Sequence, residues 1–325
     1  MKKLFLAIAL LATVASCTKD NVTSQSREAI GFGGPFISNS VKSAVDPSYV
    51  TTDDNTKNNL TSFNVYGAVE GVNIFNGNLV SKSSSNYGSA WSCAGTTQYW
   101  VAGADYIFDA VVDATTVNTD NQTGLPVSLY YEASTQKDML HNRVTTTGKP
   151  TTNNGLVAFS FTHLLSKVKF TVENTTSADA TNYRYTVTDI TITDTYATGK
   201  YAVVAQKDSD NADVTKNTWF DLTEEGTQTI ADMTIASNTT EECANEVLLI
   251  PGAEVGVTFN VNAQIKDGND WKTLTTTPVT KTGVVTLVAN NAYNFQVSVG
   301  MGGKIEFTAN TLPSWTNVTP AVGLN

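Results

Sequence analysis

The feature that most constrains this chain is a period of two in its apolar residues, which dominates the second half. Phe159 and Phe161 alternate with polar residues, and the longest run alternates from Val255 to Ile265. Because successive side chains of a strand point to opposite faces, this period predicts strands with one buried face. Many short strands separated by turn residues predict an all-β fold built from β-sandwiches.

Alternating segments, together with short continuous apolar runs such as 106–112 and 247–250, predict strands along most of the chain. Their apolar segments are 30–32, 63–68, 106–112, 127–131, 159–162, 168–172, 183–187, 190–192, 247–250, 255–265, 293–299 and 305–309. The apolar phase changes between His163 and Ser166 and again before Ile190, so we expect a bulge or kink at both places. Gly67 marks a third expected bulge or bend.

The polar stretch NRVTTTGKPTTNN, residues 142–154, contains one glycine and one proline and is interpreted as a linker. A chain of 325 residues is comfortable for two domains. We therefore expect an N-terminal β-sandwich domain over residues 28–153 and a C-terminal β-sandwich domain over residues 154–325.

The first sixteen residues have the form of a secretory signal peptide: Lys2 and Lys3, then an apolar run from Leu4 to Ala15. That run is too short to cross about 30 Å of hydrocarbon as a helix. Cys17 at the expected cut favours a bacterial lipoprotein signal, with Cys17 acylated, for instance by palmitate. An ordinary signal peptide that ends beside a cysteine stays open. Residues 17–27 are polar and are interpreted as a lipidated tether.

The chain is acidic, with a formal net charge of -10. Loss of Lys2 and Lys3 with the signal removes two positive charges and makes it -12. Such a protein is a poor partner for nucleic acid or anionic lipid heads. Cys93 and Cys243 are the other two cysteines, and two free thiols are a simpler interpretation than a disulfide between domains, which stays open.

Residues typical of catalysis or metal binding are sparse. His141 and His163 are the two histidines, and His163 shares the apolar phase of Phe159 and Phe161, as a structural histidine near a strand end does. The sequence contains no CxxC, GxSxG, HExxH or Gly-rich phosphate-loop motif. We expect no enzymatic activity, no catalytic residue, no cofactor and no metal site.

Two further features have a functional and a structural interpretation. The acidic loop 208–213 suggests calcium, but Ala212 stands where an oxygen ligand is needed, so a solvated loop is favoured. Trp91, Tyr99 and Trp100 suggest a sugar-binding platform, but core residues of the first sandwich are favoured.

The two ends of the chain and a block in its middle together resemble the fimbrillins, the subunits of the type V pili of some Gram-negative anaerobes. The N-terminal end contributes a lipoprotein signal and an arginine, Arg27, followed within a few residues by the Ile30-Gly31-Phe32 strand. FSFTHLLSKVKF at 159–170 is similar to the family's F-x-H-x-L-[AS]-K-[VI] segment. NAYNFQV at 291–297 is similar to its x-x-Y-x-[FY]-x-[VI] penultimate strand, and the stretch from Ile305 to Trp315 is similar to its terminal strand followed by tryptophan. The order and spacing of the motifs, over essentially the whole chain, carry the resemblance.

The resemblance implies two transthyretin-like β-sandwich domains, no enzymatic activity, and other pilin subunits as partners. It also implies a lipoprotein of the cell outer membrane whose lipidated leader is cut off after an arginine. Removal of the first strand then opens a groove in the N-terminal domain, which a neighbour's C-terminal strand fills. The candidate cut is Arg27-Glu28, although Arg27 as a plain tether residue stays open. The candidate donor strand lies in residues 304–325, after a possible hinge at Gly300, Gly302 and Gly303. Its candidate anchors are Ile305, Phe307, Ala309, Leu312 and Trp315.

The expected function is therefore a structural or accessory subunit of a fimbrium, assembled by donor-strand exchange and acting in adhesion. A tail that packs permanently on its own domain stays open. So does the alternative function, a permanently lipid-anchored surface protein that captures glycans or host ligands without polymerising.

Overall fold

The computed structural model describes residues 28–33, 36–37, 60–82, 90–176, 181–223, 226–236, 238–243, 246–300 and 304–312. Across these ranges the chain is all-β, as predicted, with 3-10 turns at η2 (Ala133–Thr135) and η3 (Asn153–Gly155) and no α-helix. No helix in this part of the chain has the length and apolar character needed to cross a membrane. Cys17 and Arg27 lie outside the described residues.

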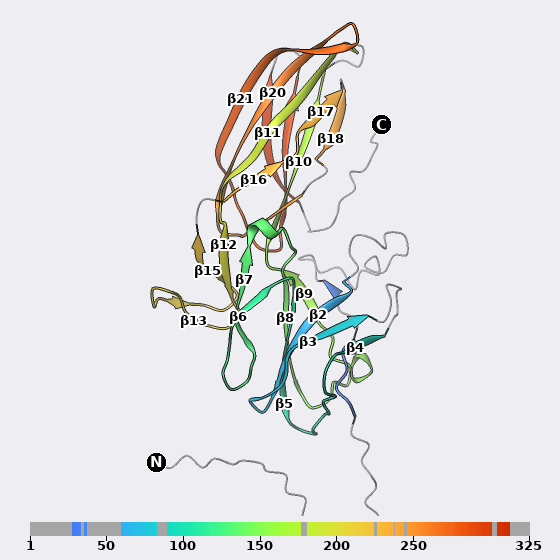
Figure 1. The fold of residues 1–325 in the computed structure, drawn as a ribbon, viewed down its shortest axis with the longest axis vertical. Coiled ribbons are helices and arrows are strands. Elements are labelled where there is room, and N and C mark those ends of the chain that lie inside the picture. The colour runs from blue at the N-terminus through green and yellow to red at the C-terminus, as the bar shows by residue number, and fades with distance from the viewer. Residues whose placement is uncertain are drawn as a thin grey trace, which may run out of the picture.

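The strands form two lobes stacked along the long axis of an elongated molecule (Figure 1). The lower lobe contains β1 (Phe36–Ile37), β2 (Ser62–Val69), β3 (Val72–Lys82), β4 (Trp91–Cys93), β5 (Asp105–Val112), β6 (Thr115–Thr119), β7 (Pro126–Glu132), β8 (Leu140–Thr147), β9 (Ser160–His163), β12 (Thr198–Ala202), β13 (Gln206–Lys207), β14 (Asp213–Val214) and β15 (Trp219–Thr223). The upper lobe contains β10 (Ser166–Asn174), β11 (Tyr183–Thr195), β16 (Gly226–Ile230), β17 (Met233–Ala236), β18 (Thr239–Glu242), β19 (Val247–Leu249), β20 (Glu254–Asp267), β21 (Asp270–Thr286), β22 (Ala292–Val299) and β23 (Ile305–Leu312).

The lower lobe is built on a seven-stranded sheet of order β1-β9-β8-β5-β2-β3-β4. Phe63 and Phe108 of this sheet, and Phe159 just before β9, lie in one core with Ile30 and Phe32. A second core joins the sheet, through Val111 of β5, to the four-stranded sheet β15-β12-β7-β6. The lobe is therefore layered, and segment 28–33 belongs to its first core.

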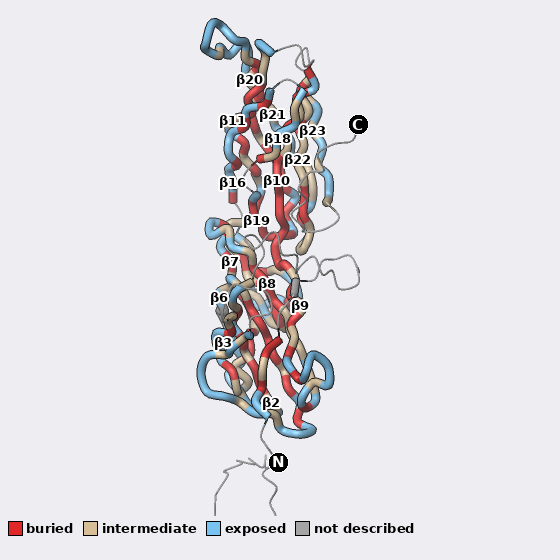
Figure 2. The backbone as a smooth tube through the Cα atoms, turned by 90° about the vertical axis from the view of Figure 1, so that its right-hand side faces the viewer, coloured by how far each residue is buried: buried red, intermediate tan, exposed pale blue. Residues whose placement is uncertain are grey.

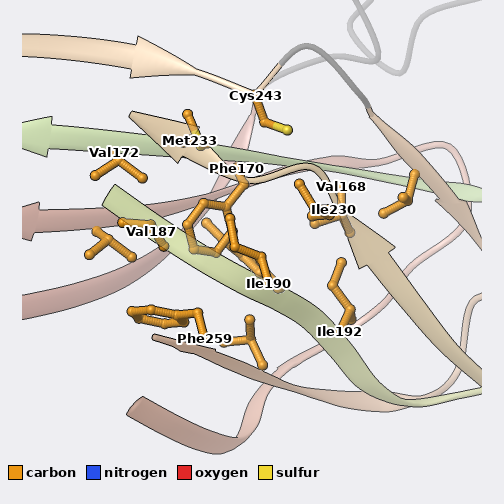
Figure 3. Packing of buried hydrophobic residues seen from close by; sticks show 14 of the residues in the cluster. Val168, Phe170, Val172, Val187, Ile190, Ile192, Ile230, Met233, Cys243 and Phe259 are labelled. Atoms are coloured by element: carbon orange, nitrogen blue, oxygen red, sulfur yellow. The ribbon is translucent and has the colours of Figure 1, made fainter. Parts of the chain in front are cut away.

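The upper lobe is a sandwich of two sheets, β18-β10-β22-β23 and β16-β11-β20-β21. Figure 3 shows side chains of β10 and β11 meeting between them, with Phe170 close to Val187 and Ile190. These residues belong to the alternating apolar segments that predicted the strands. In Figure 2 the buried segments, in red, run along the inside of both lobes.

The two lobes share contacts at their junction. Leu164, Leu165 and Ile250 pack in one core with Leu129 and Met139 of the lower lobe. The side chain of Gln136 accepts a hydrogen bond from the backbone N–H of Leu248 at 2.8 Å and donates one to its carbonyl at 3.1 Å. Apolar burial and a paired amide therefore hold the lobes together.

Two of the predicted irregularities within strands are confirmed. β11 slips its register against β20 between Thr188 and Thr191, where Asp189 has a φ of 55°. At Gly67 the pairing of β2 with β3 also shifts. A Cβ at Gly67 would lie 2.9 Å from ring carbons of both Phe75 and Phe108, so the aromatic core itself requires glycine there.

The phase change between His163 and Ser166 has a different cause from a bulge. β9 ends at His163 in the lower lobe and β10 begins at Ser166 in the upper lobe. The apolar side chains of β9 therefore face the lower core, and those of β10 face the upper core.

The interpretation of residues 142–154 as a linker is wrong for residues 142–147. They lie in β8, between β5 and β9 in the seven-stranded sheet. The division at 153/154 stays a prediction, and sheets cross it, since β9 pairs with β8 and β12 pairs with β7.

Candidate functional site

The first described segment, residues 28–33, is inserted between two parts of the chain distant from it in sequence. On one side, Ile30 N–H donates to the Gln98 carbonyl at 2.8 Å and Trp100 N–H to the Glu28 carbonyl at 2.9 Å. On the other side, Val157 N–H donates to the Gly31 carbonyl at 2.9 Å and Gly33 N–H to the Val157 carbonyl at 2.8 Å. We call the space that this segment fills the first-strand slot.

Two side chains anchor the segment in the slot, as the alternation of Ile30 and Phe32 predicts. Ile30 is 6% exposed and Phe32 is 4% exposed. The Phe32 ring lies 5.5 Å from that of Phe75 and 6.0 Å from that of Phe159, centroid to centroid. Edge-to-face and stacked ring pairs at these distances add to the burial of apolar area. The slot is therefore two apolar pockets flanked by backbone hydrogen-bonding groups.

A cavity of about 200 Å³ lies beside the segment. Ile30 and Phe32 line it, together with Trp91, Cys93 and Gln98. Burial raises the pKa of the half-buried Cys93 thiol, which keeps it protonated at neutral pH. The slot is thus not tightly closed on the β4 side.

Glu28 lies at the entrance of the segment and belongs to the candidate Arg27-Glu28 cut. Its carboxylate is 2.9 Å from Lys149 Nζ, with 57% of the Glu28 side chain exposed. An ion pair this exposed contributes little to stability. Residue 28 is therefore held mainly by its backbone bond to Trp100.

The candidate donor, β23, is the last strand in its sheet. It pairs antiparallel with β22 from Ile305 opposite Val299 to Leu312 opposite Ala292. Ile305, Phe307 and Ala309 face the upper core but are only half-buried, and Leu312 is also half-buried. The Phe307 ring lies 5.8 Å from that of Phe295 and 6.2 Å from that of Phe259. Trp315 lies outside the described residues.

The turn before β23 is closed by a hydrogen bond from Gly300 N–H to the Lys304 carbonyl at 2.9 Å. Gly302 and Gly303, the other two residues of the possible hinge, lie outside the described residues. The first segment and β23 lie in different lobes, since Ile30 and Phe32 pack in the lower core and β23 packs on the upper core. Figure 2 shows β23 along the side of the upper lobe.

His141 belongs to a buried charge cluster on the other face of the seven-stranded sheet. Asp109, fully buried, lies 2.9 Å from His141 Nε2 and 2.7 Å from Arg143 Nη2. Burial alone raises the pKa of Asp109, but the hydrogen bonds from His141 and Arg143 outweigh it and hold that pKa below its usual value. His163 ends β9 and pairs through Nδ1 with Asp138 at 2.9 Å, as a structural histidine does. Both histidines thus have structural partners.

The aromatic platform is not assembled as a flat surface. Trp91 packs on Phe63 at 5.4 Å, and Lys82 Nζ lies 5.4 Å above its ring. Trp100 packs on Tyr106 at 4.8 Å, while Tyr99 is 44% exposed. The two tryptophans are therefore partly buried core residues, the favoured interpretation.

The acidic loop connects β13 to β14. The Asp208 carboxylate accepts hydrogen bonds from the backbone N–H groups of Asp210 and Ala212, which close the loop. Nowhere in the described ranges do three or more Asp, Glu, His or Cys side chains gather as metal ligands. Cys93 and Cys243 are both free thiols.

The family comparison decides what kind of protein this is. The model of the fimbrillin-like family matches residues 49–315, most of the chain. The chain belongs to the fimbrillin-like family. The recognition from the sequence motifs is thus confirmed, and it makes this fimbrillin a pilus-related protein of the cell surface.

Solved structures agree with this fold. A fimbrial protein from Bacteroides vulgatus ATCC 8482 has a TM-score of 0.54 at 12% identity, over 89% of this chain and 100% of that one. A protein from Bacteroides uniformis ATCC 8492 assigned to cell adhesion has a TM-score of 0.52 at 17% identity, over 90% of this chain and 99% of that one. The search of curated proteins returned no match. At these identities the likeness shows the fold alone.

In this fimbrillin the three motifs that carried the recognition lie at structurally related places. The first spans all of β9 and the first part of β10, where the chain passes from one lobe to the other. The second is β22, which pairs parallel to β10 and antiparallel to β23. The third begins with β23 itself. The motifs therefore describe the centre and edge of one sheet.

Two features of the site were not predicted from the sequence. The first is the set of neighbours of the first strand, residues 98–100 and 157. They carry no motif because they contact the strand through backbone N–H and C=O groups. The cavity beside Cys93 also left no sequence signal.

Proposed function

We propose that this fimbrillin is a structural or accessory subunit of a cell-surface pilus that assembles by donor-strand exchange and acts in adhesion. The observation that carries the proposal is β23, an edge strand whose apolar face is only half-buried on its own lobe. An edge strand presents unpaired N–H and C=O groups that can pair with another chain. Given to a neighbour, β23 forms ladder hydrogen bonds and puts alternate side chains into pockets.

The driving force is the difference in free energy between burying the β23 anchors in a partner and burying them on their own lobe, because β23 is already ordered and paired in the monomer. Ile305, Phe307 and Ala309 are half-buried there. Full burial of a large apolar side chain is worth about 1.5–3 kcal/mol, so each large anchor gains roughly 1 kcal/mol on moving to a closed pocket. Leu312 and Trp315 are proposed as further anchors.

Export as a lipoprotein with Cys17 acylated, for instance by palmitate, is part of the proposal. The lipid tethers the subunit to the outer membrane until a protease cuts the Arg27-Glu28 bond. The acidic Glu28 after the bond, which many trypsin-like proteases tolerate poorly, makes this step slow. Because residues 28–33 follow the bond, the cut does not remove them, and assembly requires that a donor displace them from the slot.

No catalytic role is proposed. The paired histidines serve the fold, and the acidic net charge disfavours nucleic acid as a partner.

Detergent-resistant oligomers on the cell surface test the proposal. We expect a ladder of oligomers from wild type and from Glu306→Gln, whose side chain is exposed, but none after deletion of residues 304–325. A ladder that survives the deletion contradicts the donor role of β23.

The N-terminus of the surface protein separates assembly from a permanent anchor. A start at Glu28 in the oligomers supports the cut after Arg27. A monomer that keeps acylated Cys17 and binds glycans, less tightly after Trp91→Ala or Trp100→Ala, supports the alternative function instead.

A further inference from the structure

The sheet β16-β11-β20-β21 carries neutral hydrogen-bonding side chains on the face that points away from the upper core, which we call the outward face. Its strands β11, β20 and β21 run side by side along the upper lobe (Figure 1). Tyr185, Val261 and Ala263 belong to the core, so their neighbours along each strand point outward. The ladder places these outward residues opposite one another in rows, with Thr186, Asn262 and Thr276 in one row and Gln264 and Thr273 in the next towards the β20–β21 turn.

Hydrogen bonds between neighbouring side chains order the outward face. Asn262 Nδ2 donates to Thr186 Oγ1 at 3.3 Å, and Thr276 Oγ1 donates to Asn262 Oδ1 at 2.7 Å. Gln264 Nε2 donates to Thr273 Oγ1 at 3.3 Å. A hydroxyl group that accepts one hydrogen bond still has its own O–H to donate. The rows therefore present fixed donors and acceptors to a ligand.

Arg184 is held from two sides at the end of the outward face next to the turn. Its guanidinium carbon lies 4.3 Å from the ring centroid of Trp271, and its Nε donates to Gln264 Oε1 at 2.7 Å. Within the described ranges, no carboxylate pairs with the two Nη atoms of Arg184. A guanidinium fixed in this way offers a fork of N–H donors that fits a carboxylate.

The charges around Arg184 favour an acidic ligand, although the chain as a whole is acidic. Lys266 lies opposite Trp271 in the ladder, so it shares the outward side, and it is exposed. Asp267 and Asp270 lie opposite each other in the next pair, which points to the other side of the sheet.

One carboxylate, that of Asp189, belongs to the outward face further from the turn. It accepts a hydrogen bond from Asn260 Nδ2 at 2.8 Å. Asn260 is four residues, or about 13 Å, along β20 from Gln264. The end of the outward face near the turn thus combines two cations with neutral amide and hydroxyl groups.

We propose that this end of the outward face binds a glycan that carries a carboxylate sugar, such as a uronic acid. Arg184 takes the carboxylate through its Nη atoms, the half-buried indole of Trp271 lies against the sugar ring, and Thr273 bonds to sugar hydroxyl groups. The inference rests on the adhesive part of the proposed function and names its class of ligand. The site differs from that of the alternative function, because Trp91 and Trp100 pack on the lower core.

A polyhydroxylated ligand suits the outward face better than an acidic peptide does. Neighbouring strands lie about 4.8 Å apart, so each row presents hydroxyl or amide groups at that spacing. Sheets recognise extended peptides through the backbone groups of an edge strand and through side-chain pockets, whereas this face presents polar side chains. The site also lies at the exposed end of the upper lobe, remote from segment 28–33 (Figure 2).

Titration with a defined acidic oligosaccharide tests the inference. Protein purified from the cell surface is titrated with an oligogalacturonide and with its carboxyl-reduced, neutral counterpart. We expect the acidic form to bind at least ten times more tightly. Arg184→Gln should weaken its binding at least tenfold and Trp271→Ala at least threefold, because charge-assisted hydrogen bonds and the ring contact are lost. The matched control Lys207→Gln removes an exposed cation from the lower lobe and should change the affinity less than twofold.

Thr273→Glu keeps the test decisive if Arg184→Gln lowers the melting temperature. Thr273 is exposed and lies opposite Gln264, so a carboxylate there competes for the guanidinium and should also weaken binding at least tenfold.

No binding of the oligogalacturonide, equal affinity for the neutral form or for polyglutamate, or a loss with Trp91→Ala but not with Arg184→Gln overturns the inference. Wild type that binds the oligogalacturonide through Arg184 but forms no ladder of oligomers supports the inference and overturns the proposed assembly.

Discussion

Replacing Phe32 with alanine measures how much the first strand contributes to the lower lobe. Phe32 is 4% exposed, and four aromatic rings lie with their centroids 5.5 to 6.4 Å from its own. Removal of a buried phenylalanine typically costs about 3–5 kcal/mol, and lost ring pairs place this site toward the upper end. We expect the free energy of unfolding of the chain that starts at Glu28 to fall by about 4 kcal/mol.

The same truncation at Phe307 is the matched comparison. Phe307 is half-buried on an edge strand, so Phe307→Ala is expected to cost only about 2 kcal/mol in the monomer. Urea titration of both variants, followed by tryptophan fluorescence, gives the two values. A loss below about 1 kcal/mol for Phe32→Ala, or equal losses at both sites, would refute the view that Phe32 is a buried anchor and Phe307 a half-buried residue of an edge strand.

Three further predictions concern the rest of the lower lobe. The depressed pKa of Asp109 means that its stabilisation is fully present above the unfolded-state pKa, about 3.9, and is lost as pH falls through the lower folded-state value. Asp109→Asn should therefore flatten the acid limb of a stability–pH curve and, by taking the charged partner from half-buried Arg143, cost about 1–3 kcal/mol at pH 7; an unchanged acid limb would contradict this. Because burial raises its pKa, Cys93 should react with a thiol reagent at pH 7 more slowly than free cysteine, and a rate equal to free cysteine would show an open slot. Gly67→Ala, which puts a methyl group 2.9 Å from two rings, should lower the free energy of unfolding by about 1–3 kcal/mol and with it the melting temperature. Gly33→Ala should cost less than about 1 kcal/mol, and equal shifts in melting temperature would show that the rings move aside.

Strands that bury one face were visible in the sequence. The alternation from Val255 to Ile265 corresponds to β20, and the phase change before Ile190 corresponds to a bulge in β11. These features arise from local burial, which the period of two records directly.

Strands without an apolar face were missed. β21 runs from Asp270 to Thr286 as an exposed, Thr-rich edge strand, so it needs no buried side to form. β8 was interpreted as a linker because Asn142, Arg143 and three threonines make it polar, yet Arg143 pairs with buried Asp109. Composition cannot distinguish such a strand from a loop when ion pairs take the place of apolar contacts.

Only the side chains that anchor the two strands could be predicted from the sequence. Ile30, Phe32, Ile305 and Phe307 were visible as alternating apolar residues. Their partners were not, because the slot is made by backbone groups of residues 98–100 and 157, distant in sequence and without a pattern. Long-range pairing of this kind depends on the fold as a whole.

The central claim is that each subunit gives one strand and receives one. It is tested most directly by mixing an excess of wild-type chain that starts at Glu28 with a labelled chain that lacks residues 304–325. The labelled chain can receive a strand but cannot give one, so the account predicts one labelled subunit in each labelled oligomer, always at its end, and shorter oligomers as its share rises. Labelled subunits at several positions in one oligomer, or none in any, would contradict the account.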